Sequence, residues 1–129
     1  MGACLLLTAA AQAQPAVTPA LPRLHLAPEQ QLRAGSHNTI EVVVELPPGN
    51  DSPLLLTPST SGSAVEVVRG RLSRSDGKVM DATHLRFEIP VRARTEGTAI
   101  LRVEVMTYVC ARTCHRVLLQ GSQVLRVQS

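Results

Sequence analysis

The chain has 129 residues, of which 44% are hydrophobic, so it is long enough for one domain with its own core. Only 2% of the residues are aromatic, so valine, leucine, isoleucine and alanine must fill that core. The net charge is +3, and the arginines are scattered among acidic residues rather than gathered in a run. Because a basic patch and aromatic stacking platforms are both missing, we do not expect a nucleic-acid partner.

Residues 1–13 are typical of a cleaved export signal. A short apolar stretch, "ACLLLTAAA", precedes the A-x-A pattern of Ala11–Gln12–Ala13. The apolar stretch is too short to span a bilayer, and no other segment approaches that length. We therefore predict a periplasmic or secreted protein, with cleavage after Ala13 and no transmembrane segment in the mature chain. Residues 14–22 are rich in proline and alanine and are predicted to form a linker.

From residue 23 onward, short apolar runs of period two alternate with clusters of glycine, proline, serine and aspartate, a pattern typical of β-sandwiches and barrels. Asp76–Gly77 is the strongest hairpin signal between runs. Seven such runs without a capped helical stretch predict an all-β fold over residues 23–129, an immunoglobulin-like antiparallel β-sandwich. The predicted strands are 23–27, 38–47, 53–57, 64–74, 83–93, 98–110 and 114–128.

The last two runs are predicted to form a hairpin with Ala111–Arg112–Thr113 as its loop. A three-residue loop places Cys110 opposite Cys114 and Tyr108 opposite Arg116. Alternation assigns the residues of the run 98–110 to two faces. Leu101, Val103, Val105, Thr107 and Val109 share one face, while Arg102, Glu104, Met106, Tyr108 and Cys110 share the more exposed one.

The cysteine pair is the main functional signal. Removal of the signal peptide, which contains Cys4, leaves two cysteines, and an exported compartment favours one intramolecular disulfide between them. In the loop-entropy model, so short a loop stabilises by about 2 kcal/mol, against about 4–5 kcal/mol for a loop near a hundred residues. The bridge is therefore poorly placed as a stabilising link, which favours thiol–disulfide exchange.

The charges around the pair favour the same interpretation. Arg112, His115 and Arg116 flank it, and no acidic residue lies within five positions along the chain. Nearby positive charge favours the thiolate, which is the attacking species in exchange. We therefore assign Cys110 and Cys114 as the catalytic pair, with the three basic residues tuning the thiolate.

Two other functions stay open. The domain is alternatively a non-enzymatic module that binds a protein through an exposed sheet edge and carries a structural disulfide. A third interpretation is a Cu(I) or Zn site at the hairpin, from Cys110, Cys114 and His115 with Met106. The sequence does not show whether the other histidines, His25, His37 and His84, converge. No cofactor is expected, because no phosphate-binding loop, nucleophile elbow or metalloprotease motif is found.

Two segments carry a resemblance to a known family. "ELPPGNDSP" (45–53) and "TAILRVEVMTYVCARTCHRVLL" (98–119) resemble parts of the N-terminal β-sandwich domain of the thiol–disulfide interchange protein DsbD. They are also similar to the related C-terminal domain of bacterial thioredoxin-like NHL-repeat proteins. The resemblance implies an exported domain that passes electrons from a thioredoxin-like donor to exported oxidoreductases. By position, that role falls to Cys110 and Cys114, and the implied partner is a thioredoxin-like or other exported protein.

Overall fold

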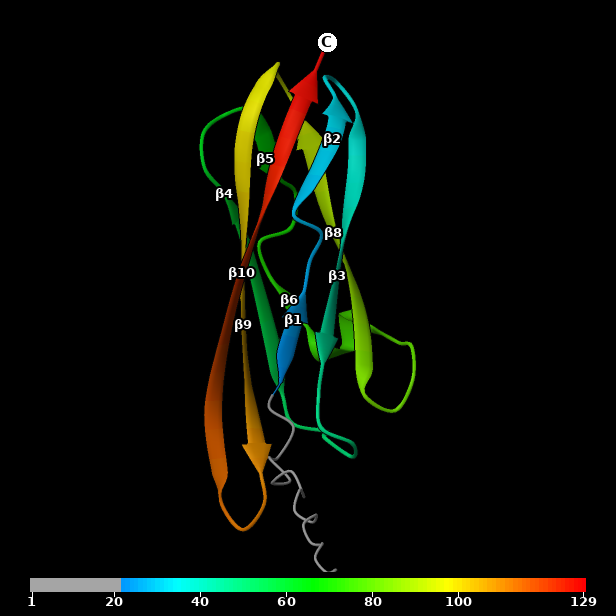
Figure 1. Cartoon of the computed structure of the whole chain (residues 1–129), viewed down its shortest axis with the longest axis vertical. Coiled ribbons are helices and arrows are strands. Elements are labelled where there is room, and N and C mark those ends of the chain that lie inside the picture. The colour runs from blue at the N-terminus through cyan, green and yellow to red at the C-terminus, as the bar shows by residue number, and fades with distance from the viewer. Residues whose placement is uncertain (1–21) are drawn as a thin grey trace, which may run out of the picture.

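The computed structural model describes residues 22–129, so the predicted signal peptide at 1–13 and residues 14–21 of the predicted linker lie outside it. The described residues form two sheets that pack face to face (Figure 1), which confirms the predicted all-β sandwich. One 3₁₀ turn, η2 (Arg74–Asp76), is the only helical element in this range. The strands are β1 (Arg23–His25), β2 (Glu29–Arg33), β3 (His37–Glu45), β4 (Leu54–Thr60), β5 (Val65–Val67), β6 (Leu72–Ser73), β7 (Lys78–Val79), β8 (His84–Ala93), β9 (Gly97–Cys110) and β10 (Cys114–Gln128).

The order of the strands is that of an immunoglobulin-like sandwich. One sheet has the order β1-β3-β8-β5, with β7 also paired to β8, and the other has the order β2-β10-β9-β4-β6. These orders correspond to the ABED and GFC sheets of that architecture. All pairs are antiparallel except β2 and β10, which run parallel. Because β1 and β2 belong to different sheets, the segment around Pro28 carries the chain from one sheet to the other.

Two short strands, β2 and β7, fall outside the predicted runs, and one predicted run forms two strands instead of one. In β2 only Leu32 is apolar, so there is no alternation to detect, and the strand is held by its backbone pairing with β10. The prediction of a single strand over residues 64–74 was wrong, because the two halves of this run belong to different sheets. β5 pairs with β8, whereas β6 pairs with β4, and residues 68–71 connect them.

Asp76–Gly77 does not form the hairpin that the sequence indicates. The strands on either side of it, β6 and β7, lie in different sheets and are joined by η2. Gly77 has φ −83°, whereas the tight hairpin turn favoured by an Asp-Gly pair requires positive φ. Glycine is needed here for space, because a Cβ on Gly77 would lie 2.8 Å from Cζ of Phe87.

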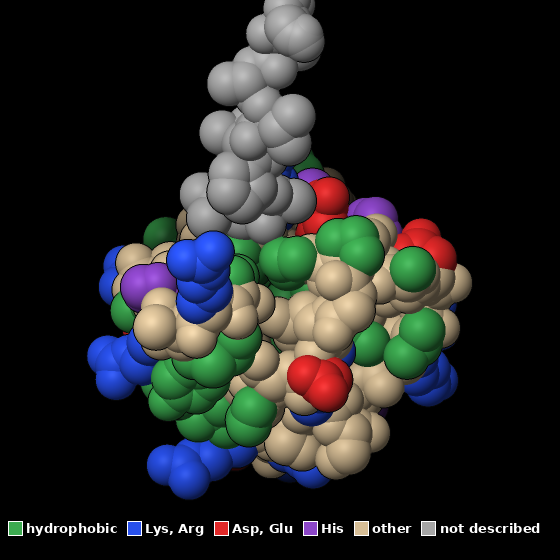
Figure 2. Space-filling view, turned by 90° about the horizontal axis from the view of Figure 1, so that it is seen from below, with side chains coloured by type: hydrophobic (Ala, Val, Ile, Leu, Met, Phe, Trp, Pro, Cys, Tyr) green, Lys and Arg blue, Asp and Glu red, His purple; other side chains and the backbone are tan. Residues whose placement is uncertain are grey.

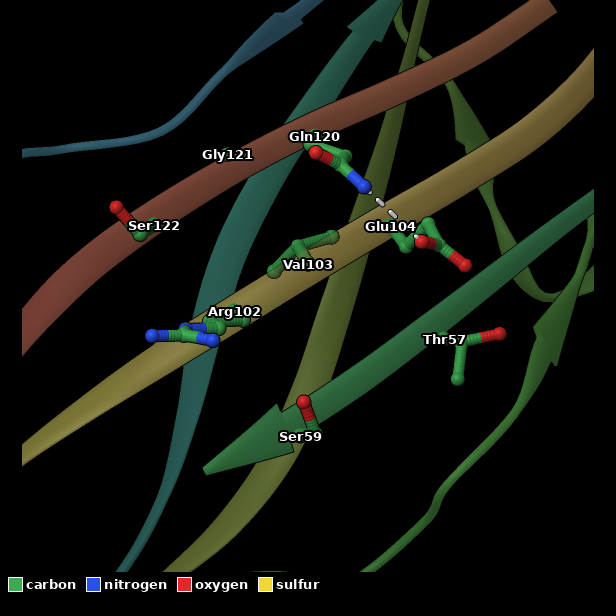
Figure 3. A pocket seen from close by; sticks show the side chains of 8 residues that line it. All are labelled: Thr57, Ser59, Arg102, Val103, Glu104, Gln120, Gly121 and Ser122. Carbon is green, nitrogen blue, oxygen red and sulfur yellow. Dashed lines mark hydrogen bonds between the residues drawn. The ribbon is translucent and has the colours of Figure 1, made fainter. Parts of the chain in front are cut away.

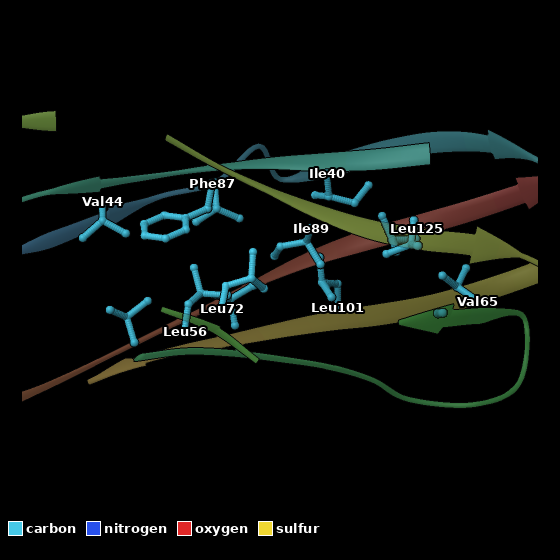
Figure 4. Close-up of a cluster of buried hydrophobic side chains, with 14 of the residues drawn as sticks. Ile40, Val44, Leu56, Val65, Leu72, Phe87, Ile89, Leu101 and Leu125 are labelled. Carbon is cyan, nitrogen blue, oxygen red and sulfur yellow. The ribbon is translucent and has the colours of Figure 1, made fainter. Parts of the chain in front are cut away.

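The core lies between the two sheets and is almost entirely aliphatic, as the composition predicts. Phe87 is its one aromatic side chain and is fully buried (Figure 4). In β9 the inward residues are Leu101, Val103, Val105 and Thr107, which confirms the predicted faces. Thr107 is the polar member of this row, and its hydroxyl donates to the backbone oxygen of Pro53 at 2.9 Å.

The β9–β10 hairpin extends beyond the sheet that it belongs to. The two strands pair from Gly97 and Val127 to Cys110 and Cys114. On one side β4 pairs with β9 only as far as Thr107, and on the other side β2 pairs with β10 only from residue 124 onward. The end of the hairpin is therefore a two-stranded projection at the end of the molecule away from the C-terminus (Figure 1). Over residues 22–129 no helix has the length and hydropathy needed to cross a membrane.

Candidate functional site

Cys110 and Cys114 form a disulfide with an S–S distance of 2.05 Å at the last pair of the β9–β10 ladder. The predicted register is confirmed, with Cys110 opposite Cys114 and Tyr108 opposite Arg116. The three-residue loop brings the two cysteine Cα atoms to 3.9 Å. All residues from 110 to 116 are exposed, so the bridge lies at a solvent-accessible tip.

The three basic residues predicted to tune the thiolate lie on this tip. Arg112 is in the loop, whereas His115 and Arg116 belong to β10, and all three are exposed. His115 Nε2 lies 3.2 Å from the hydroxyl of Thr113. None of the ion pairs found among residues 22–129 involves these three side chains, so the positive charge of Arg112 and Arg116 is not neutralised by a salt bridge in this range.

The loop between β3 and β4 lies beside the disulfide, which sequence reasoning missed. The hydroxyl of Ser52 is 3.8 Å from Sγ of Cys110, and Asn50 Nδ2 donates to the backbone oxygen of Tyr108 at 3.0 Å. Each of these contacts joins residues that are 58 positions apart, so spacing along the chain could not reveal them. The loop also contains Asp51. Along the chain no acidic residue lies within five positions of the cysteines, but the fold brings the loop that carries Asp51 next to them.

Arg74 fixes the position of this loop. Its guanidinium Nη1 donates to Oδ1 of Asn50 at 3.1 Å and to the backbone oxygen of Ser52 at 2.8 Å. Nη2 donates to the backbone oxygen of Asn50 as well. Arg74 belongs to η2, which connects β6 of one sheet to β7 of the other, so hydrogen bonds to the sandwich hold the loop that contacts Cys110.

A shallow groove of about 500 Å³ lies on the outer face of the second sheet, away from the tip (Figure 3). Within it, Gln120 Nε2 donates to Oε2 of Glu104 at 3.2 Å. None of the predicted site residues lines this groove, and we assign it no function. The side chains drawn in Figure 3 are those of Thr57, Ser59, Arg102, Val103, Glu104, Gln120 and Ser122, with Gly121 between the last two.

The histidines outside the hairpin converge in part. His25 Nε2 lies 2.9 Å from Oε1 of Glu45, and His84 Nε2 lies 4.0 Å from the same oxygen. His37, at the start of β3, is at the opposite end of that strand from Glu45. The hydrogen bond from His25 is the main cause that lowers the pKa of Glu45. The backbone N–H of Thr83, followed by His84, lowers the pKa of Asp81 to about 2.

The hairpin itself offers little to a metal ion in this form. Its two sulfur atoms are bonded to each other, so neither is available as a thiolate ligand. Among residues 22–129, the cluster of His25, Glu45 and His84 is the only group of three such side chains close enough to share an ion.

Comparison with known proteins gives no assignment: no protein-family model matches the chain, and no curated protein matches it.

Proposed function

We propose that this is an exported domain that exchanges thiol–disulfide equivalents with a thioredoxin-like partner through Cys110 and Cys114. The observation that carries the proposal is the exposed disulfide at the tip of a projecting hairpin. A partner thiolate must reach one of the two sulfur atoms, and accessibility is one of the factors that set the rate of exchange. At this tip no other element has to open first.

The small structural value of the bridge supports the proposal. Cys110 and Cys114 are 4 residues apart and are the last pair of a ladder that continues to Gly97. A loop this short stabilises by about 2 kcal/mol in the entropy model. Reduction therefore leaves the rest of the hairpin paired, as a reversible redox cycle requires.

The contacts around the pair suggest which sulfur is attacked. The thiolate of the partner attacks Sγ of Cys114, the S–S bond breaks, and Cys110 leaves as a thiolate. The hydroxyl of Ser52, 3.8 Å from Cys110, donates to that negative charge, and hydrogen bonds to charged groups are stronger than neutral ones. Arg112 and Arg116 add positive charge at the exposed tip, and nearby positive charge favours the thiolate.

The second step completes the exchange. A second thiolate of the partner attacks its own sulfur in the mixed disulfide, and Cys114 leaves as a thiolate. The partner dithiol is then oxidised to a disulfide, and two electrons reside on Cys110 and Cys114, which take up two protons from water. The resemblance of residues 45–53 and 98–119 to the DsbD domain supports this direction of transfer, because that domain receives electrons from a thioredoxin-like donor.

The export signal predicted at residues 1–13 fits the same proposal, because disulfides persist in exported compartments.

The test is the reduction potential of the pair, measured in graded thiol buffers by alkylation and mass spectrometry. Cys4→Ser serves as the background, so that only two thiols are counted. A midpoint near about −200 mV supports exchange, whereas structural bridges lie below about −300 mV. Oxidised thioredoxin is the probe for the reverse of the second step: we expect the Cys114 thiolate of Cys110→Ser to attack the thioredoxin disulfide and form a mixed disulfide, and Cys114→Ser to form less. A bridge that stays oxidised until the protein unfolds would refute the proposal.

A protein-binding module is the second candidate, and one observation favours it. Over residues 114–123, β10 has a hydrogen-bonded strand neighbour on one side only within the described chain. The other edge strands are short, with three residues in β5 and two in β6. An extended peptide can add to a free edge of this kind. A disulfide that resists reduction, together with a bound peptide along β10, would favour this candidate over exchange.

A further inference from the structure

Three neighbouring strands of the first sheet bring two imidazoles and a carboxylate to one place. Glu45 at the end of β3 lies directly opposite His84 at the start of β8. His25, at the end of β1, pairs with Val43 and is therefore the diagonal neighbour of Glu45. Because side chains alternate along a strand, all three lie on the outer face of the sheet.

This cluster is at the same end of the molecule as the projecting hairpin, but in the other sheet. In Figure 2, which looks onto that end, histidine side chains lie beside acidic ones on one side and beside arginine or lysine on the other. The exposed fractions are 51% for His25, 35% for Glu45 and 32% for His84. The three side chains are thus half-buried against one another while remaining open to solvent.

The distances fit an ion with short bonds. The three ligand atoms all lie within 4.8 Å of one another, and two of the separations are 2.9 Å and 4.0 Å. A tetrahedral zinc ion with bonds of about 2.0–2.2 Å places its ligand atoms about 3.3 Å apart. Shifts of the side chains on the order of 1 Å therefore bring all three atoms to bonding distance. The hydrogen bond between His25 and Glu45 is replaced in that step, and the ring N–H of His25 then resides on Nδ1.

The hydrogen bonds around His84 leave its Nε2 as the nitrogen that can bind a metal. Its Nδ1 is 2.9 Å from Oδ1 of Asp81, so the Nδ1–H donates to that carboxylate. The carboxylate is itself held by the backbone N–H of Thr83 at 2.9 Å. This arrangement directs the lone pair of Nε2 towards Glu45. A carboxylate that orients a histidine in this way is the common partner of histidines bound to zinc.

We propose that His25, Glu45 and His84 bind one divalent late transition-metal cation, Zn²⁺ being the best match, with Asp81 as the positioning residue. Two imidazoles and a carboxylate suit zinc or copper, whereas calcium and magnesium prefer six or more oxygen ligands. Three protein ligands at an exposed site leave at least one coordination position for water or for a group of a partner. The site is independent of the cysteine pair and goes beyond the proposed exchange.

The test is calorimetric titration of the full chain with ZnCl₂, without an affinity tag, with the disulfide intact and in the Cys4→Ser background. We expect one ion per chain and no binding of Ca²⁺. Asp81→Asn is expected to lower the affinity by about 10–100-fold, and His25→Ala and His84→Ala by more. His37→Ala is the matched control, since this histidine also lies on the first sheet, and it should leave the affinity unchanged.

A readout on the unsubstituted side chains keeps the test independent of folding defects. In NMR spectra of the Cys4→Ser chain, Zn²⁺ is expected to shift the ring signals of His25 and His84 but not those of His37. The absence of binding at millimolar Zn²⁺, an unchanged affinity in His84→Ala, or a loss of binding in His115→Ala would each overturn the proposal. The last result would place the ion at the hairpin instead.

Discussion

Removal of the disulfide should cost little stability, and the structure allows the amount to be calculated. The perturbation is the double substitution Cys110→Ser/Cys114→Ser. Both residues are exposed, so the serine hydroxyls remain in water and no buried contact is lost. The main effect is then on the unfolded chain, where the bridge closes a loop of five residues between positions that are 4 apart.

For five residues the loop-entropy relation gives about 2 kcal/mol at 25 °C. This value is an upper limit, because an unfolded chain that retains some of this local hairpin has less freedom to lose. By thermodynamic linkage, the same stabilisation makes the bridge harder to reduce in the folded than in the unfolded chain. A difference of about 2 kcal/mol corresponds to only about 40 mV for a two-electron couple. The fold therefore lowers the reduction potential of the disulfide only slightly, so a partner dithiol can still reduce it.

The assay is equilibrium unfolding in urea of the oxidised chain and the double-serine variant, both in the Cys4→Ser background. We expect the free energy of unfolding to fall by about 2 kcal/mol or less, with a cooperative transition in both proteins. A loss of about 4 kcal/mol or more, or a variant that does not fold, would refute the reasoning. The bridge would then be a structural link, and the exchange proposal would lose its energetic basis.

Two further predictions concern the segment around η2. Gly77→Ala should destabilise the domain by about 1–3 kcal/mol in the same urea assay, because the new methyl group lies 2.8 Å from the ring of Phe87, which is fully buried; an unchanged stability would show that the ring can move aside. The backbone N–H of Ser73 holds the pKa of Asp76 below its ordinary value. The stabilisation from this carboxylate is therefore present above the unfolded pKa of about 3.9 and is lost as the pH falls through the lower folded value. The difference in unfolding free energy between the wild type and Asp76→Asn should shrink between neutral and acid pH, and a difference independent of pH would contradict this account.

The sequence predicted the long strands well because each has one buried face. β3, β8, β9 and β10 have 9 to 15 residues, and their alternation is sustained over most of that length. The register of the last hairpin was also predictable, since a three-residue loop fixes which residues lie opposite one another. The short strands β2 and β7 were not, because backbone pairing with a neighbour holds them and their own sequence carries no period.

Part of the candidate site could be predicted from the sequence, and part could not. The cysteines and their basic neighbours lie within seven consecutive positions, so the sequence alone could bring them together. Ser52 reaches Cys110 through the pairing of β4 with β9, and His25 reaches Glu45 through the pairing of β1 with β3. Contacts of this second kind depend on which strands become neighbours, and nothing in the local pattern of a single sequence records that choice.

The parallel pairing of β2 with β10 has a consequence for how the domain is made. Glu29, near the start of the described chain, has its partner at Val124, in the last strand. The β2–β10 pairing therefore cannot form until residues 124–128 have been synthesised, and contacts so distant along the chain are slow to form. Until then β2 has no strand partner, and Leu125 and Val127 are missing from the core. Exposed apolar surface and unpaired strand edges promote aggregation, so the domain is most exposed to aggregation before residues 124–128 are available.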